Sequence, residues 1–272
     1  MLIRQIRVFR GPSSSSLRGG CYHRRMAELP IMHAHRPVYD WVGRLKVLRS
    51  SYDAECAADP SRVDRDAEWL DASLVFHALK LKGVDVVIDD VRSARRSASG
   101  ASADVANAIA ALAHVRSLAT ARATLDAAAI AGINGLLDPG SGGSLRTGAP
   151  VAAYQGHSAP GPDVLPHLLD NATDWFTADS FNDDFHPVEQ SALALIRICD
   201  LQPFPANNEL TARLAASVFT LRAGWPPVVV HHELEAEYRK AILHAMHMDT
   251  QPIVDLLAKC VELTYAELGI TG

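Results

Sequence analysis

The chain has 272 residues, of which 48% are hydrophobic and 21% are charged, a composition typical of a globular protein with one large domain or two small ones. No apolar run approaches the roughly 18 residues that a transmembrane helix needs, so no membrane partner is expected. Aromatic residues make up only 6% and alanine is abundant, which favours closely packed helices over sheets.

The net charge of −5 is unevenly distributed along the chain. Residues 1–26 carry six arginines and no acidic residue, so the remainder holds 20 basic against 31 acidic residues. An acidic body is not typical of a nucleic-acid-binding protein, and no nucleic-acid partner is expected. The cysteines lie far apart without a C-x-x-C pair, which indicates neither a zinc knuckle nor a disulfide framework and makes a reducing cytoplasm the expected location.

Residues 1–30 are rich in arginine and serine, which superficially matches an organellar targeting peptide. We interpret them as a disordered extension or as the product of a start codon assigned too early, with Met26 or Met32 as the initiator. They are left out of the predicted fold.

The spacing of apolar residues predicts a series of helices. The first two cover 38–51 and 63–80. Residues 84–91 suit either a short strand or the start of a helix, 92–102 are rich in serine, arginine and glycine and predict a loop, and 103–130 form a helical region broken near 118–122. Further helices are expected over 163–175, 187–201 and 211–223, and two more between 233 and 268.

The stretch 195–223 is the centre of the chain and predicts helix, polar loop, helix. Its loop, residues 202–209, holds two prolines and two asparagines, so both helices must break there. The first N–H groups of the following helix lack partners and would favour an anion. Asn208 and Arg213 are therefore candidates for binding an anion; alternatively, Asn208 caps the helix and Arg213 pairs with a nearby acidic residue.

This stretch resembles the signature of the Fic/Doc (Fido) family, His-x-Phe-x-Asp/Glu-Gly-Asn-Gly-Arg-x-x-Arg. Phe204, Asn208 and Arg213 match it, and the resemblance implies that these three residues bind a nucleotide. The other signature positions differ: the catalytic His falls on Gln202, the acidic metal ligand on Ala206, the two glycines on Asn207 and Glu209, and the first arginine on Leu210.

These differences alter the chemistry that the resemblance implies. In the family the His takes the proton of a target hydroxyl that attacks the α-phosphate of ATP, and the amide of Gln202 has no basic site for this step. Ala206 offers no side-chain oxygen to Mg²⁺. Glu209 would place a carboxylate near the phosphates, where two charges about 4 Å apart repel by roughly 4 kcal/mol at an effective dielectric near 20. ATP and Mg²⁺ are thus expected only if activity is retained.

Two other segments resemble parts of the same family. Residues 73–78 resemble its inhibitory helix, Ser/Thr-x-x-x-Glu-Gly/Asn, with Ser73 retained and His77 in place of the Glu. The glycine-rich residues 138–148 resemble the segment that leads into a β-hairpin flap, which grips a target peptide by strand addition. Arg146 and Thr147 fit that pattern; the alternative is a plain linker.

Histidines and one acidic residue gather near the end of the chain: His231, His232, Glu235, His244 and His247. A metal site needs three or four converging ligands, and no His-Glu-x-x-His is present. We interpret these histidines as solvated or core residues and assign no metal site.

The sequence therefore predicts a mainly α-helical, Fic-like fold with a small β-hairpin flap. Residues 31–102 would form an N-terminal helical segment, 103–232 the Fic-like core and 233–272 its C-terminal helices. The leading hypothesis is a degenerate protein that lacks AMP transfer and binds a protein or a ligand in the former cleft.

Two alternatives stay open. One is an active transferase of a nucleotidyl or phosphoryl group onto a protein hydroxyl, with Gln202 positioning the substrate and Arg213 holding phosphate, or with His77 or His186 as a substitute base. The other is an all-α regulatory or scaffold protein whose resemblance is accidental.

Overall fold

The computed structural model describes residues 39–97, 100–150, 154 and 156–271, and this part of the chain is helical with no strand. The first half contains α2 (Asp40–Ala58), α3 (Arg62–Leu81), α4 (Ile88–Arg96), α5 (Ala103–Thr120) and α6 (Ala127–Leu137). The second half contains α7 (Leu165–Thr177), α8 (Asp179–Asp184), α9 (Pro187–Leu201), α10 (Asn208–Arg222), the short 3₁₀ helix η2 (His232–Leu234), α11 (Glu235–Met246) and α12 (Gln251–Glu267). The prediction of a mainly helical fold is confirmed.

The small β-hairpin flap is not seen among the described residues, and the expected flap residues 151–153 lie outside them, as does the predicted extension over residues 1–30. Residues from Tyr39 onward form one compact unit. The division into segments at 102 and 232 stays a prediction. None of the helices in the described ranges combines the length and the apolar character needed to cross a bilayer.

The helices predicted to end at 51 and 130 extend to Ala58 and Leu137, and two further predicted boundaries are wrong. Residues 92–96 belong to α4 instead of a loop. This helix has Asp89 and Asp90 in its first turn and two arginines in its last, an arrangement that complements the helix dipole. The second boundary concerns α10, which begins at Asn208 and not at Thr211, so the last two residues of the predicted loop lie in the first helical turn.

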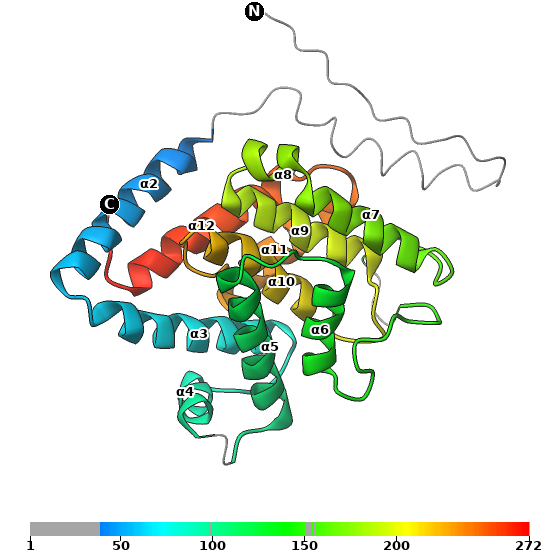
Figure 1. Cartoon of the computed structure of the whole chain (residues 1–272), viewed down its shortest axis with the longest axis horizontal. Helices are drawn as coiled ribbons and strands as arrows, with labels where there is room; N and C mark the ends of the chain where they lie inside the picture. The colour runs from blue at the N-terminus through cyan, green and yellow to red at the C-terminus, as the bar shows by residue number, and fades with distance from the viewer. Residues whose placement is uncertain (1–38, 98–99, 151–153, 155, 272) are drawn as a thin grey trace, which may run out of the picture. The chain divides into compact units, whose positions relative to one another are not determined.

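The core is built on the antiparallel pair α9 and α10, which lies at the centre of Figure 1. Helices that are apolar on all sides belong in a protein interior, and nearly every residue of α9 and of α10 up to Thr220 is buried. Small residues allow the two helices to approach closely, as where the hydroxyl of Ser191 donates to the carbonyl of Ala216 over 2.7 Å.

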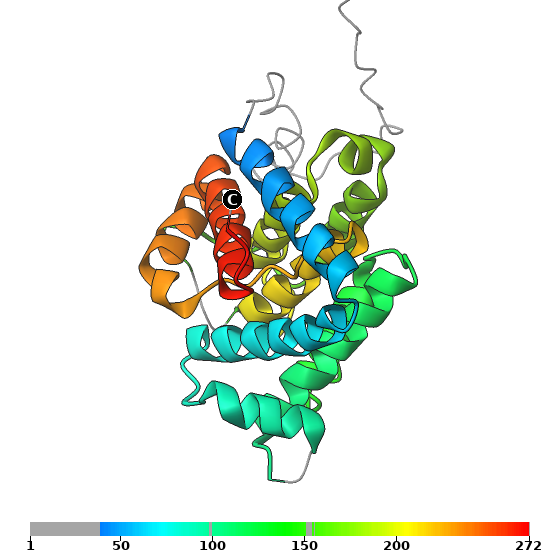
Figure 2. The same cartoon turned by 90° about the vertical axis from the view of Figure 1, so that its left-hand side faces the viewer.

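The remaining helices cover this pair. Helices α5 and α6 pack against each other and against α10, while α12 packs against α9 and α2. Figure 2 shows α2 in blue running beside the red α12, with α3 in cyan crossing below them. Because α3 and α11 also contact the central pair, the loop between α9 and α10 is surrounded by elements from both halves of the chain.

Candidate functional site

The loop between α9 and α10 is enclosed by two residues in the left-handed conformation. Gln202 ends α9 with φ 44°, and Asn207 precedes α10 with φ 58°. Asparagine tolerates this conformation better than most non-glycine residues, because its short polar side chain can bond locally. Asn207 can therefore keep the turn although the Fic signature has a glycine at this position.

Asn208 closes the loop on itself. Its Oδ1 accepts from the backbone N–H of Phe204 at 2.8 Å, and its Nδ2 donates to the carbonyl of Phe204 at 2.7 Å. The residue preceding the helix is Asn207, whose side chain makes no cap, so the expectation that Asn208 caps α10 is wrong. Both polar ends of Asn208 hold the loop backbone, and its binding of a nucleotide stays a prediction.

Arg146 anchors the start of the loop. Its guanidinium is buried and donates to the carbonyls of Gln202 at 2.7 Å, Gly148 at 2.7 Å and Pro160 at 2.6 Å. The last carbonyls of a helix lack intrahelical partners, and a cation near them is favourable. This residue, expected to lead into a flap, thus fixes the end of α9, whereas its neighbour Thr147 is exposed.

Helix α6 supports the loop from behind. The side chain of Asn134 is fully buried and donates to the carbonyl of Ala206 and to the hydroxyl of Thr211, both at 3.0 Å. The glycine-rich segment after α6 lies close against it: a Cβ on Gly143, which has φ +78°, would meet the carbonyl oxygen of Ala131 at 2.1 Å. This segment is held by close packing on α6.

A cavity of about 520 Å³ opens beside the loop. Its lining residues come from the loop, from α10 and from three distant parts of the chain: Leu81, Lys82, Tyr154, Gln202, Pro205, Ala206, Asn207, Asn208, Glu209, Leu210, Arg213 and Arg239. Ligand pockets in proteins have volumes of about 300–1,000 Å³, so the cavity has room for a small organic molecule or a few side chains of a partner.

An ion pair within α10 occupies one side of this cavity. Nη1 of Arg213 lies 2.7 Å from Oε1 of Glu209, and its Nη2 donates to the carbonyl of Ala78 at 3.0 Å. The arginine side chain is 2% exposed and that of the glutamate 28%. Burial tends to lower the pKa of Arg213, but Tyr238 and Glu209 outweigh it and raise the pKa above its ordinary value. The buried guanidinium is therefore charged and already holds a carboxylate.

Other polar groups around the cavity are also engaged. The hydroxyl of Tyr154 donates to Oε2 of Glu209 at 3.4 Å, and burial raises the pKa of this tyrosine well above its usual range. Nζ of Lys82 donates to Asp104 at 2.7 Å, and Nε of Arg239 donates to Glu235 at 2.8 Å. Among the described residues, the cavity wall thus carries three basic side chains and one carboxylate.

Two donors of residues at the cavity wall have no hydrogen-bond partner among the described residues, Nε of Arg213 and Nε2 of Gln202. Both side chains are buried, and Gln202 is 3% exposed. A buried, unpaired donor is costly unless a ligand or a water satisfies it. Gln202 is a lining residue of the cavity, and the wall contains no imidazole in the described part of the chain.

The other predicted residues lie away from the cavity. Phe204 is completely buried in the core. Ser73 lies in α3 with its hydroxyl 3.4 Å from Glu267, and His77 contacts His232. The side chain of His186 accepts from the N–H of Val188 at the start of α9. Neither histidine lines the cavity, so neither stands in for the family base in this structure.

Sequence reasoning missed the contributions of Lys82, Asn134, Tyr154 and Arg239. These residues lie far from the loop in the sequence, and no local motif relates them to it. Tertiary packing brings them to the loop, with Lys82 directly after α3, Asn134 on α6 and Arg239 on α11. Glu209 was recognised, but its pairing with Arg213 at four-residue spacing depended on α10 starting earlier than predicted.

Comparison with known proteins finds similarity to one protein family and to solved structures of the same fold. The model of the Fic/DOC family matches residues 124–220. Over 130 residues the chain is 32% identical to the protein adenylyltransferase Fic of Drosophila willistoni, and over 131 residues it is 33% identical to that of Drosophila grimshawi. These matches cover 48% of the chain and 26% of each relative, so the chain spans about a quarter of the length of the relatives.

Two solved structures share the fold. A Fic domain-containing signaling protein from Bacteroides thetaiotaomicron superposes with a TM-score of 0.71 at 19% identity, covering 82% of this chain and 95% of that one. Fic-1 from C. elegans superposes with a TM-score of 0.68 at 24% identity, covering 90% and 75%. Residues 124–220, which contain the α9–α10 loop and most of the cavity wall, therefore match the model of the Fic/DOC family, and the fold is that of the two Fic-domain structures.

Proposed function

We propose that this Fic domain does not transfer AMP and that its cleft binds a ligand or a segment of a partner protein. The observation that carries the proposal is the ion pair of Glu209 with Arg213 inside the cavity. Arg213 is the arginine that matches the end of the family signature, and an anionic ligand would have to displace a carboxylate that lies 2.7 Å from it.

The position of the family base supports the same proposal. Gln202 lies at the wall of the cavity, but an amide can orient a hydroxyl without removing its proton. The one carboxylate in the wall is paired with Arg213 and accepts from Tyr154. No lining group is thus a free base near neutral pH within the described residues, and Ala206 supplies no side-chain oxygen for Mg²⁺.

The occupant that suits this cavity carries hydrogen-bond acceptors without a concentrated negative charge. The unpaired Nε2 of Gln202 would donate to it, while the apolar walls from Leu81, Pro205 and Leu210 would bury its carbon atoms. An amide-rich peptide segment or a neutral metabolite has these features. A cytoplasmic location is part of the proposal and rests on the sequence alone.

An active transferase is the second candidate. It is favoured by Lys82 and Arg239, two cations that line the same cavity, and by the relatives that are named protein adenylyltransferases. In this case positioning and electrostatics would have to supply the rate, with ATP held by the cations after Glu209 swings away.

Transfer of AMP to lysate proteins from ATP labelled at the α-phosphate tests the proposal. We expect no incorporation above background by the full chain, with or without Mg²⁺. The reference is a variant in which Gln202, Ala206, Asn207, Glu209 and Leu210 carry the family residues His, Asp, Gly, Gly and Arg. Label that increases in proportion to the unaltered protein, and is lost in an Arg213→Ala variant, would overturn the proposal.

A further inference from the structure

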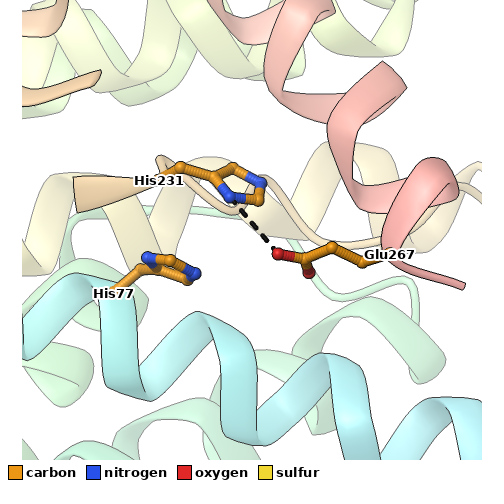
Figure 3. A group of neighbouring side chains, drawn as sticks. All are labelled: His77, His231 and Glu267. Atoms are coloured by element: carbon orange, nitrogen blue, oxygen red, sulfur yellow. Dashed lines mark ion pairs between the residues drawn. The ribbon is translucent and has the colours of Figure 1, made fainter. Parts of the chain in front are cut away.

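A second group of titratable side chains lies at α3, away from the residues that line the cleft. It consists of His77 on α3, His231 and the η2 residues His232 and Glu233 in the segment that joins α10 to α11, and Glu267 at the end of α12. Figure 3 shows His77, His231 and Glu267 converging from three separate elements. Elements far apart in sequence thus bring five ligand-type side chains together.

Three of these side chains have the separations of metal ligands. Nδ1 of His77 lies 2.8 Å from Nδ1 of His232, which lies 3.3 Å from Oε2 of Glu233, and the third side of the triangle measures 3.8 Å. A tetrahedral ion with ligands at about 2.0–2.1 Å requires neighbouring ligand atoms to lie about 3.3 Å apart. The three distances bracket this value.

We propose that His77, His232 and Glu233 bind a divalent transition-metal ion of the Zn²⁺ class. Two imidazoles and one carboxylate form a common ligand set for this ion and leave a fourth position for water. The set does not suit Mg²⁺ or Ca²⁺, which prefer oxygen ligands. The site does not depend on the proposed function of the cleft.

The state of His77 suits this role. Its Nδ1 accepts from the backbone N–H of His232 at 3.1 Å, so this nitrogen is unprotonated, and the ion would take its lone pair in place of that hydrogen bond. A hydrogen bond between the two imidazoles is the alternative account of their 2.8 Å separation, and it requires no ion.

The group drawn in Figure 3 is a competing ligand set. His77, His231 and Glu267 also offer ligand atoms within 4.8 Å of one another, with His231 and Glu267 3.5 Å apart. We place the ion at His232 and Glu233 because their side chains are 30% and 65% exposed, which provides an entry path that a metal site needs. His231 then lies beside His77, with the two ring centroids 4.6 Å apart, and pairs with Glu267 at 3.5 Å.

Calorimetric titration of Zn²⁺ into untagged, chelator-treated full chain tests the site. We expect one ion per chain, and at least about a tenfold loss of affinity in His232→Gln and in Glu233→Gln. Both residues are partly exposed, so the variants should fold, which circular dichroism checks. His244→Gln is the matched control, because His244 is an exposed histidine that pairs with Asp249; it should bind as the unaltered chain does.

Spectra of the Co²⁺-loaded chain give a second readout, since four-coordinate Co²⁺ absorbs visible light far more strongly than the hydrated ion. We expect this absorption in the unaltered chain and in His244→Gln, and its loss in Glu233→Gln. Absence of stoichiometric binding at about 100 μM Zn²⁺ would overturn the proposal. The proposal would also be overturned if the Glu233→Gln variant bound Zn²⁺ as tightly as the unaltered chain, or if Glu267→Gln lost more Zn²⁺ affinity than Glu233→Gln.

Discussion

Removing the carboxylate of Glu209 should convert the cleft into an anion site and weaken the fold. In the unaltered protein the buried guanidinium of Arg213 has two hydrogen-bond acceptors, Oε1 of Glu209 at 2.7 Å and the carbonyl of Ala78 at 3.0 Å. Breaking a fully buried ion pair costs about 3–5 kcal/mol. Because the glutamate is 28% exposed and water can enter its place, we expect Glu209→Ala to lose about 2 kcal/mol of unfolding free energy.

The same substitution should raise the affinity for ATP. A phosphate on Arg213 would lie about 4 Å from the Glu209 carboxylate, at a cost of roughly 4 kcal/mol for an effective dielectric near 20. Solvent screening reduces this figure, so we expect a gain of about 2.7 kcal/mol, which is about 100-fold in Kd. ATP at 100 times the Kd of the variant would then restore about 2.7 kcal/mol of stability.

Urea unfolding at 25 °C with and without about 1 mM ATP measures both effects. The matched control is Glu235→Ala, which removes a carboxylate 2.7 Å from another arginine of the cavity, Arg239, where both side chains are about half exposed. Exposed pairs contribute about 0–1 kcal/mol, so the control should lose little stability and gain little from ATP. An equal response to ATP in the two variants would refute the reasoning.

Three further predictions concern residues that shape the site. Burial, together with the charges of Lys46 and Arg49, lowers the pKa of His186 to about 4. In the unfolded chain this histidine has a pKa near 6.5, so the unfolded state binds the proton first as the pH falls. The free energy of unfolding should therefore be full above pH 6.5 and fall by about 3 kcal/mol between pH 6.5 and 4. His186→Asn keeps a capping acceptor and should remove this part of the loss, measured as the difference in unfolding free energy between pH 7 and 4.5. Arg146→Lys should cost about 2 kcal/mol, because an ammonium cannot serve the carbonyls that the guanidinium fork reaches. Asn207→Ala should cost about 1–2 kcal/mol through its positive φ, whereas Asn207→Gly should be close to neutral; urea midpoints measure both.

Each of these predictions has an outcome that contradicts it. Parallel stability curves of His186→Asn and the unaltered chain from pH 7 to 4.5 would show that this imidazole is not held neutral. An unchanged urea midpoint in Arg146→Lys would mean that the carbonyls at the end of α9 do not need the guanidinium. Equal midpoints for Asn207→Ala and Asn207→Gly would exclude backbone conformation as the reason for asparagine at this position.

Periodicity predicted the helices well where apolar residues face one core. The predicted helix over 187–201 coincides with α9, and the two expected C-terminal helices are α11 and α12. The prediction failed over residues 92–96, whose serine and arginines are typical of a loop. These residues lie in α4, where two arginines in the last turn complement the negative end of the helix dipole. The start of α10 was misplaced because the positive φ of Asn207 is a property of the folded loop.

The site was predictable only in its local part. The loop and its differences from the family signature were recognised from adjacent residues. The roles of Arg146 and Asn134 depend on which carbonyls the fold places near them, and the cations come from distant places, Lys82 directly after α3 and Arg239 from α11. His77 illustrates the same limit, since its partners lie about 155 residues further along the chain.

The most direct test of the central claim is calorimetric titration of ATP, with and without Mg²⁺, into the unaltered chain from Met26 onward, with GTP and CDP-choline as further ligands. The account predicts no heat of binding at millimolar nucleotide, because Glu209 occupies Arg213 and Gln202 and Ala206 replace the base and the metal ligand. Saturable binding of ATP in the micromolar range would contradict it and would establish the cleft as a nucleotide site.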